Sequence, residues 1–178
     1  MKEFGGNSVS LGVALGKITV FQKESDEPEK EFVEDIKKEL ARFNEALTRA
    51  KDELEILYKE AVDKVGEENA LIFDVHKMML EDLDYIDNIE SLIKEEKVTA
   101  EYAVFVTGEI FSKTFADMDD DYMKARSVDV TDISKRVIRK LTGKAETSIE
   151  SSEPVIILAD DLTPGETINL DKSKVLAF

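Results

Sequence analysis

The chain has 178 residues, 42% of them hydrophobic, and it carries a formal net charge of −16. This length and apolar content are sufficient for one large or two small globular domains with a real core. The acidic balance argues against nucleic acid as a partner, because phosphate contacts require Lys and Arg, and it favours a basic protein partner.

The sequence contains no segment that predicts membrane insertion. Its longest apolar run, Val155 to Ala159, is far too short to span a bilayer, and Met1 is followed by polar and glycine residues rather than by a signal sequence. Cysteine is absent, which excludes disulfides and thiol chemistry. We therefore expect a soluble, cytoplasmic protein.

The N-terminal stretch, residues 5–21, begins glycine-rich and ends with apolar and β-branched residues, which predicts a loop feeding a strand. Its glycines fit neither the dinucleotide fingerprint nor the phosphate-loop pattern, so a nucleotide site is not expected here. Pro28 stands where a helix can begin.

A long helix is predicted over residues 29–65, because apolar residues recur there at alternating steps of four and three. These positions are Ile36, Leu40, Phe43, Leu47, Ala50, Leu54, Leu57 and Ala61. Such a helix reaches roughly 50 Å, so other helices must lie along its apolar stripe. Gly66 follows the last turn and predicts its end.

Four further helical segments follow, over residues 67–82, 84–97, 99–118 and 122–141. Thr99 is a good N-cap, and Gly143 follows a cationic last turn, as expected at a helix C-terminus. The middle of the chain is therefore predicted to form a helical bundle or a set of helical hairpins.

The pattern changes near the C-terminus. Val155 to Ala159 is a continuous apolar run typical of a buried strand, and Thr163-Pro164 predicts a capped short helix to about Leu170. Residues 175–178 read as another strand. A strand, a short crossover and a strand predict a parallel pair, with the N-terminal strand as the third member of the sheet.

The order of these elements predicts a fold of class α+β or α/β, in which a bundle of the four-helix type, built on the long helix, is inserted in a discontinuous α/β subdomain. We expect residues 1–26 and 145–178 to form the α/β part and residues 27–144 to form the helical part. The chain stops on an apolar strand, leaving a small sheet that cannot be fully covered, so we expect a truncated subdomain.

His76 is the only histidine and hence the only candidate for imidazole chemistry. Without a neighbouring base or a glycine-rich phosphate cradle, direct catalysis is disfavoured against a role as a surface or interface residue. If exposed, Asp74, Lys77, Glu81 and Asp82 would tend to keep it partly charged, which favours recognition over nucleophilicity.

The acidic run Asp117 to Asp121 superficially resembles a calcium loop, but Tyr122 stands where the loop requires glycine and Val128 where it requires the closing glutamate. We therefore interpret the run as a solvated bend between helices and expect no metal site in this chain. No nucleophile-elbow, kinase or metallohydrolase spacing is present, so no catalytic residue is assigned.

Four segments together resemble one known family. They are residues 10–17 (SLGVALGK), 72–82 (IFDVHKMMLED), 129–136 (DVTDISKR) and 159–164 (ADDLTP). In this order they resemble the N-terminal part of enzyme I of the bacterial phosphoenolpyruvate-dependent sugar phosphotransferase system. Leu11 departs from the family, which usually has proline after the serine.

The resemblance implies a transferase that passes phosphate from phosphoenolpyruvate to the small carrier protein HPr. It implies a helical subdomain that binds HPr, inserted in an α/β subdomain whose phosphorylated histidine lies beyond the last strand of this chain. It also implies that a C-terminal barrel, absent here, binds phosphoenolpyruvate and magnesium and forms the dimer. We therefore expect this chain alone to be an inactive monomer without a cofactor, and the full-length enzyme to be a homodimer.

Carried over by position, the resemblance implies an HPr-binding surface on two helices. Its residues are Glu67, Glu68, Leu71, Asp74, His76, Met78, Met79, Asp82 and Asp84, with Met123 and Arg126 from the later helix. The residue types suit this role independently, because carboxylates can meet a basic rim and flexible Met side chains can adapt to an apolar patch. Leu71 and Met79 could instead be bundle core.

Two other interpretations of the sequence remain. The chain could be a freestanding helical interaction module whose seam, from Ile36 to Ala61, pairs with itself or with another protein, which predicts a concentration-dependent oligomer. A related swivelling phosphohistidine domain of the pyruvate-phosphate dikinase type is disfavoured, since such domains lack a comparable helical insertion.

Overall fold

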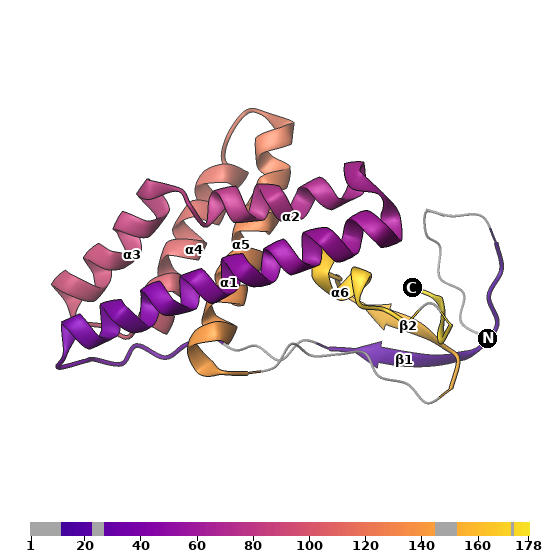
Figure 1. The fold of residues 1–178 in the computed structure, drawn as a ribbon, viewed down its shortest axis with the longest axis horizontal. Helices are drawn as coiled ribbons and strands as arrows, with labels where there is room; N and C mark the ends of the chain where they lie inside the picture. Colours follow the sequence, from indigo (N-terminus) through magenta and orange to yellow (C-terminus); the bar gives the residue numbers. More distant parts are fainter. Residues whose placement is uncertain (1–11, 23–26, 145–152, 172) are drawn as a thin grey trace.

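A computed structural model describes residues 12–22, 27–144, 153–171 and 173–178 of the chain. Its elements, in order, are β1 (Lys17–Phe21), α1 (Ile36–Val65), α2 (Glu67–Met79), α3 (Leu83–Glu96), α4 (Ala100–Ala116), α5 (Asp121–Thr142), β2 (Val155–Ala159), α6 (Pro164–Ile168) and β3 (Val175–Ala177). The predicted fold class, a helical bundle combined with a small parallel sheet, is confirmed (Figure 1).

The long helix α1 begins at Ile36, so the prediction that it starts near Pro28 is wrong. The preceding segment is extended instead, because it forms backbone hydrogen bonds with the α3–α4 connection: Val33 N donates to Lys97 O at 2.7 Å, and Thr99 N donates to Glu31 O at 3.1 Å. The side chain of Asp35 then accepts from Lys38 N at 3.0 Å and caps the helix.

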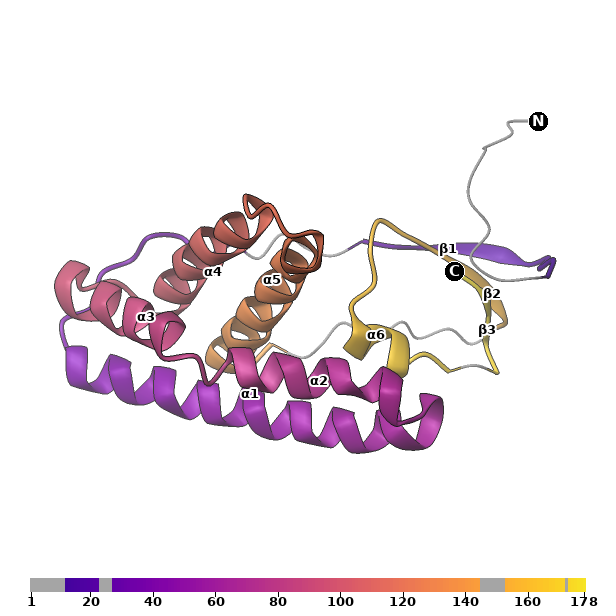
Figure 2. The same ribbon diagram turned by 90° about the horizontal axis from the view of Figure 1, so that it is seen from above.

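The apolar stripe of α1 is covered by the other helices of the same chain. Helices α2 and α3 return along α1, and α4 and α5 lie across the remaining side (Figures 1 and 2). Phe43, Ala50, Leu54 and Ala61 are fully buried in one continuous core to which all five helices contribute. The long helix is thus stabilised by burial of its seam.

Helices α4 and α5 form a hairpin around the acidic segment, and the prediction of a bend there is confirmed. Helix α4 ends at Ala116, and Asp120 caps α5 by accepting from Met123 N at 2.9 Å. The two helices approach closely at Gly108, where a β carbon would come within 2.5 Å of Ser134 Oγ. Only a residue without a side chain permits this spacing.

The three strands form a parallel sheet in the order β1-β2-β3, as the sequence predicts. Lys17 pairs with Val155 and Phe21 with Ala159. The crossover helix α6 has the predicted Thr163 cap, completed by Glu166 as a capping box, but it ends at Ile168, earlier than expected.

One face of the sheet remains exposed, as expected for a sheet this small. Phe21, Val155 and Ile157 form a small apolar core on the inner face. On the outer face Ile18 and Leu158 are exposed.

Because β1 pairs with β2, the five helices between them in sequence are an insertion in the α/β part. The proposed boundaries at residues 26/27 and 144/145 fall at the edges of segments outside the described residues, and they stay a prediction. In the part of the chain that the structure describes, no helix is long and apolar enough to cross a membrane.

Candidate interaction surface

Helix α2 follows α1 almost without a loop. Gly66 ends α1 with a φ of 89°, a value that favours glycine, and its N–H donates to Val62 O at 3.1 Å. The chain then reverses into α2, whose first turn carries Glu67 and Glu68, where the helix dipole favours acidic residues. Figure 2 shows α2 lying alongside α1 on one side, and His76 of α2 lies against Asp129 of α5 on another, so these two sides of α2 are covered.

Seven of the eleven predicted site residues are exposed. They are Glu67, Glu68, Leu71, Asp74, Met78, Asp82 and Asp84. Met78 exposes 65% of its surface and Leu71 exposes 49%, whereas Ala70 and Phe73 on the same helix are buried. Helix α2 therefore presents large apolar side chains among carboxylates, in addition to the apolar face that it buries.

Leu71 and Met79, which could instead belong to the bundle core, differ from each other in the structure. Leu71 is exposed, so the core interpretation is wrong for this residue. Met79 is half-buried and packs against the main core, so it contributes to packing and can offer only part of its side chain to a partner.

Asp82 also has a role in the fold. Its Oδ1 atom accepts from Tyr85 N at 3.0 Å, which makes it the N-cap of α3. This cap separates α2 from α3. The sequence predicts the start of α3 at residue 84, one residue later than in the structure. A substitution at Asp82 would therefore change both the surface charge and the start of a helix.

The first turns of α5 supply the other part of the surface, where Met123 and Arg126 are half-buried. Arg126 Nη1 donates to Asp129 Oδ2 at 2.7 Å, and Nη2 donates to Tyr122 Oη at 2.9 Å. The guanidinium also lies 4.6 Å from the centre of the Tyr122 ring, as in a cation–π contact. Its hydrogen bond with Asp129 raises the pKa of Arg126, although burial opposes this effect.

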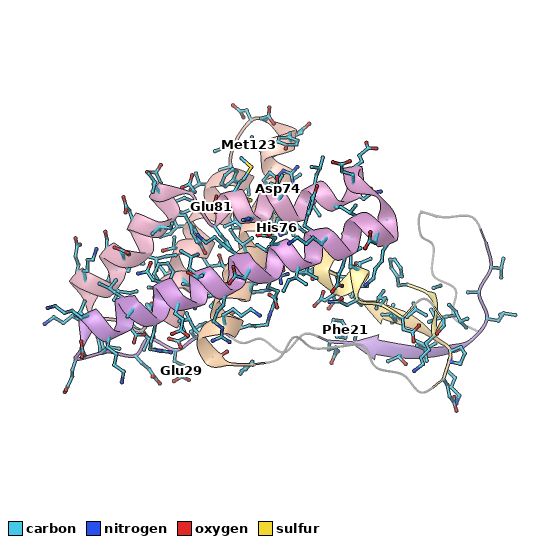
Figure 3. The ribbon with its side chains drawn as sticks, in the orientation of Figure 1. Phe21, Glu29, Asp74, His76, Glu81 and Met123 are labelled. Carbon is cyan, nitrogen blue, oxygen red and sulfur yellow. The ribbon has the colours of Figure 1, made fainter. Side chains whose placement is uncertain are left out.

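Sequence reasoning did not identify Tyr122 as part of this surface. Tyr122 exposes 62% of its area, and its partnership with Arg126 is a contact between residues four apart on one helix. That spacing is visible in the sequence and could have indicated the pair. In Figure 3, Met123 and Asp74 both lie on the upper side of the molecule, whereas Glu29 lies on its lower side.

His76 is fully buried, so the expectation that it is a surface residue is wrong. Its neighbours also differ from those expected. Nε2 lies 3.2 Å from Asp129 Oδ1, and Nδ1 lies 3.6 Å from Asp132 Oδ2, both on α5. The sequence could not reveal this arrangement, because nothing in it pairs α2 with α5.

The exposed apolar side chains of α2, set among carboxylates, suit recognition of a protein. Among the described residues, no group of three or more His, Cys, Asp or Glu side chains could hold a metal ion. A separate hollow of about 340 Å³ lies beyond the ends of β1 and β2 and is lined by Phe21, Gln22, Lys135, Asp160 and Asp161. His76 Nε2 does lie 3.2 Å from Asp129 Oδ1, but the imidazole is fully buried and therefore not open to a substrate.

Residues 5–126 match the family model described as "PEP-utilising enzyme, N-terminal". The chain is 37% identical over 178 residues to a phosphoenolpyruvate-protein phosphotransferase of Bacillus sp. (strain S), and 35% identical over 179 residues to one of Bacillus subtilis (strain 168). These alignments cover 99% and 100% of this chain but 31% of each relative. The chain thus spans about a third of the length of these relatives.

Two solved structures share the fold. An NMR structure titled as Enzyme I (nEIt) matches with a TM-score of 0.73 and 33% identity, over 91% of this chain and 66% of that one. A structure titled "N-terminal domain of Enzyme 1 - Nitrogen" matches with a TM-score of 0.68 over 93% of this chain and 68% of that one. Its identity is 24%, so this second likeness concerns the fold alone.

Proposed function

Because the chain belongs to the PEP-utilising enzyme N-terminal family, we propose that it is the part of a phosphoenolpyruvate-protein phosphotransferase that docks the phosphocarrier protein HPr. The resemblance to this family that the sequence indicates is confirmed. HPr as the partner, and the surface that it contacts, are our proposal.

One observation carries the proposal: Met78 and Leu71 are exposed on a helix that already buries a full apolar face. Large apolar side chains surrounded by polar ones are typical of protein interaction surfaces. Met is unbranched and flexible, so it can fit a partner that must dock and leave repeatedly. A transient complex of this kind has a modest interface and a Kd near one micromolar, about −8 kcal/mol.

The charge on the surface indicates what kind of partner fits. Glu67, Glu68 and Asp74 are exposed beside the apolar side chains, and the whole chain carries −16. A basic rim on the partner would match these carboxylates, and the field of the acidic protein would raise the encounter rate.

The chemistry belongs to the longer protein. We propose that phosphoenolpyruvate and magnesium bind outside this chain, that the phosphorylated histidine also lies outside it, and that the longer protein is a homodimer. Buried His76, which faces two carboxylates, is then not the phosphorylated histidine. The expected cytoplasmic location and monomeric state of this chain are parts of the same proposal.

The alternative of a freestanding coiled-coil module is not favoured. It requires the seam of α1 to be free for pairing, but Phe43, Leu54 and Ala61 are fully buried by the chain's own helices. Self-association through this seam would require the bundle to open.

A calorimetric titration of the 178-residue chain with HPr tests the proposal. We compare Asp74→Lys with Glu29→Lys, which makes the same charge change on the lower side of the molecule, away from Asp74 (Figure 3). We likewise compare Met78→Ala with Phe32→Ala, since Phe32 is 72% exposed but belongs to the extended segment before α1.

We expect one-to-one binding by the unmodified chain, weakened about tenfold by Asp74→Lys and at least about fivefold by Met78→Ala. The two control variants should bind as the unmodified chain does. Absence of binding by a folded chain, or equal losses in the controls, would contradict the docking assignment.

A further inference from the structure

A series of polar contacts joins the buried His76 to the surface of α5. His76 Nε2 lies 3.2 Å from Asp129 Oδ1, and Arg126 Nη1 donates to Asp129 Oδ2 at 2.7 Å. Arg126 Nη2 in turn donates to Tyr122 Oη at 2.9 Å. The series begins at a fully buried side chain of α2 and ends at Tyr122, which is largely exposed.

Asp129 is the junction of this series, because each of its two carboxylate oxygens faces a different partner. Burial alone would raise the pKa of Asp129, but contacts with His76 and Arg126 lower it, so the group is a carboxylate at neutral pH. A carboxylate held at both oxygens cannot rotate without losing one contact. The orientation that Asp129 offers to Arg126 therefore depends on His76.

His76 is itself held in place. Its side chain is fully buried between α2 and α5, and its second ring nitrogen lies 3.6 Å from Asp132 Oδ2. Figure 3 shows His76 inside the bundle, with Asp74 of the same helix nearer its upper side. An imidazole confined in this way is a rigid support, unlike an exposed side chain.

Arg126 differs from His76, because a long side chain near the surface samples many rotamers unless other residues hold it. Its side chain retains 22% exposure. Two of its five N–H donors point to Asp129 and Tyr122, and the guanidinium carbon lies 4.6 Å from the centre of the Tyr122 ring. A side chain ordered before binding loses less conformational entropy when a partner engages it.

We propose that His76 is a positioning residue for partner binding, which acts through Asp129 to hold the guanidinium of Arg126 in a fixed place on the interaction surface. This inference rests on the proposed function, because HPr is the partner that Arg126 would meet. The fixed guanidinium suits a carboxylate or a backbone carbonyl oxygen of that partner. On a predominantly acidic surface, a cation at a defined point sets the register of the complex.

Two substitutions of His76 separate positioning from general packing. In His76→Gln the amide nitrogen can reach the place of Nε2 and keep the contact with Asp129. In His76→Asn the shorter amide matches the place of Nδ1, which faces Asp132 instead. Both variants keep a polar side chain in the bundle, so they form a matched pair.

The first measurement is the ¹⁵N spectrum of the arginine side chains in the chain without any partner. We expect the Nη signals of Arg126 to be resolved and slowly exchanging in the unmodified chain and in His76→Gln. In His76→Asn we expect these Nη signals to merge into one averaged signal, because the guanidinium rotates freely. Asp129→Asn should average them as well, whereas Asp132→Asn, which also removes a buried carboxylate, should leave them resolved.

The second measurement is the affinity of the same variants for HPr. Ordering one long side chain costs about as much as a three- to tenfold change in Kd, so His76→Asn and Asp129→Asn should weaken binding by that factor. His76→Gln and Asp132→Asn should bind as the unmodified chain does.

The inference is overturned if Arg126 stays ordered in folded His76→Asn, or if His76→Gln and His76→Asn lose Arg126 order equally. If a His76 variant fails to fold, the same arginine spectra of Asp129→Asn and Asp132→Asn, which keep His76, test the inference. Equal order of Arg126 in these two variants would overturn it. If the unmodified chain does not bind HPr, the proposed function fails, whereas the arginine spectra still test the link between His76 and Arg126.

Discussion

Arg136 of α5 is completely buried, and its Nη1 atom donates to Glu53 Oε2 of α1 at 2.6 Å. The second oxygen of Glu53 accepts from Lys140 Nζ at 2.5 Å. One carboxylate thus pairs with two cations at the junction of the longest helix with the last helix of the bundle. A buried guanidinium without this partner would be strongly unfavourable.

Glu53→Gln should therefore destabilise the fold. The variant keeps the shape of the side chain but leaves Arg136 buried without a counter-charge. Because Glu53 itself retains 26% exposure, we expect a loss of about 2 kcal/mol in the free energy of unfolding, below the full cost of breaking a buried pair. This corresponds to a fall in Tm of about 4 to 8 °C.

Glu60→Gln is the matched control, since Glu60 also lies on α1 and pairs with Lys64 at 3.3 Å, but at the surface. We expect it to change the free energy of unfolding by less than about 0.5 kcal/mol. If the two substitutions lower the free energy of unfolding in urea equally, the buried contact between Glu53 and Arg136 contributes no more stability than a surface ion pair.

Stability should fall in acid because of the same carboxylates. Burial opposes the shift, but Lys140 and Arg136 lower the pKa of Glu53 below 4.5, and His76 and Arg126 lower that of Asp129 below 3.8. A group with a depressed pKa in the folded state contributes stability above its unfolded pKa, and this contribution is lost as the pH falls through the folded pKa.

We therefore expect these two groups to leave the free energy of unfolding unchanged between about pH 7 and pH 5.5, and to lower it below about pH 4.5. Urea unfolding measured at several pH values checks this expectation. In Glu53→Gln the acid-induced loss should be smaller than in the unmodified chain. An equally steep loss in that variant would contradict the role assigned to Glu53.

Gly108→Ala should destabilise the α4–α5 hairpin. Alanine favours a helix by about 1 kcal/mol over glycine, but here the new β carbon would lie 2.5 Å from Ser134 Oγ and 2.8 Å from Ser134 Cβ. We expect a net loss of about 1 to 3 kcal/mol. The cost should be smaller in the Ser134→Gly background, by at least about 1 kcal/mol.

That double-mutant cycle is informative because Ser134 also contacts Tyr85, whose hydroxyl lies 2.8 Å from Ser134 Oγ. Burial raises the pKa of Tyr85 far above its ordinary value, so this hydroxyl stays neutral. The contact between Tyr85 and Ser134 is lost in the Ser134→Gly variant and in the double variant alike, so this loss cancels in the cycle. Additive effects of the two substitutions would mean that the hairpin relaxes to admit the methyl group.

Binding of HPr should weaken as salt increases, because charges near the surface are screened. The Kd of the unmodified chain should rise between about 50 and 300 mM salt. In Asp74→Lys the dependence should be shallower, since one attraction is removed and a repulsion replaces it. A Kd independent of salt would show that the acidic residues of α2 do not take part.

The sequence predicts elements well where the local pattern and the long-range structure agree. The seam of α1, the Thr163 cap and the glycine ends at Gly66 and Gly143 all depend on residues close to one another in the chain. The start of α1 could not be predicted in this way. Residues before Ile36 pair with the distant α3–α4 connection, and this pairing overrides the helix-start signal at Pro28.

In the candidate site, too, some features follow from the local sequence and others depend on distant residues. Exposure of Met78 follows from its place on α2, away from the positions that face α1. His76 lies on the same helix, but its burial depends on Asp129 and Asp132, more than fifty residues later. Knowledge of how α2 packs on α5 was required to distinguish an exposed imidazole from a buried one.

The most direct test of the docking surface is an NMR titration of the ¹⁵N-labelled chain with unlabelled HPr. We predict that the amide signals that shift belong to α2 and to the first turns of α5, with the largest changes around Met78 and Arg126. Changes confined to the exposed face of the sheet, around Ile18 and Leu158, or no changes at all, would contradict the account.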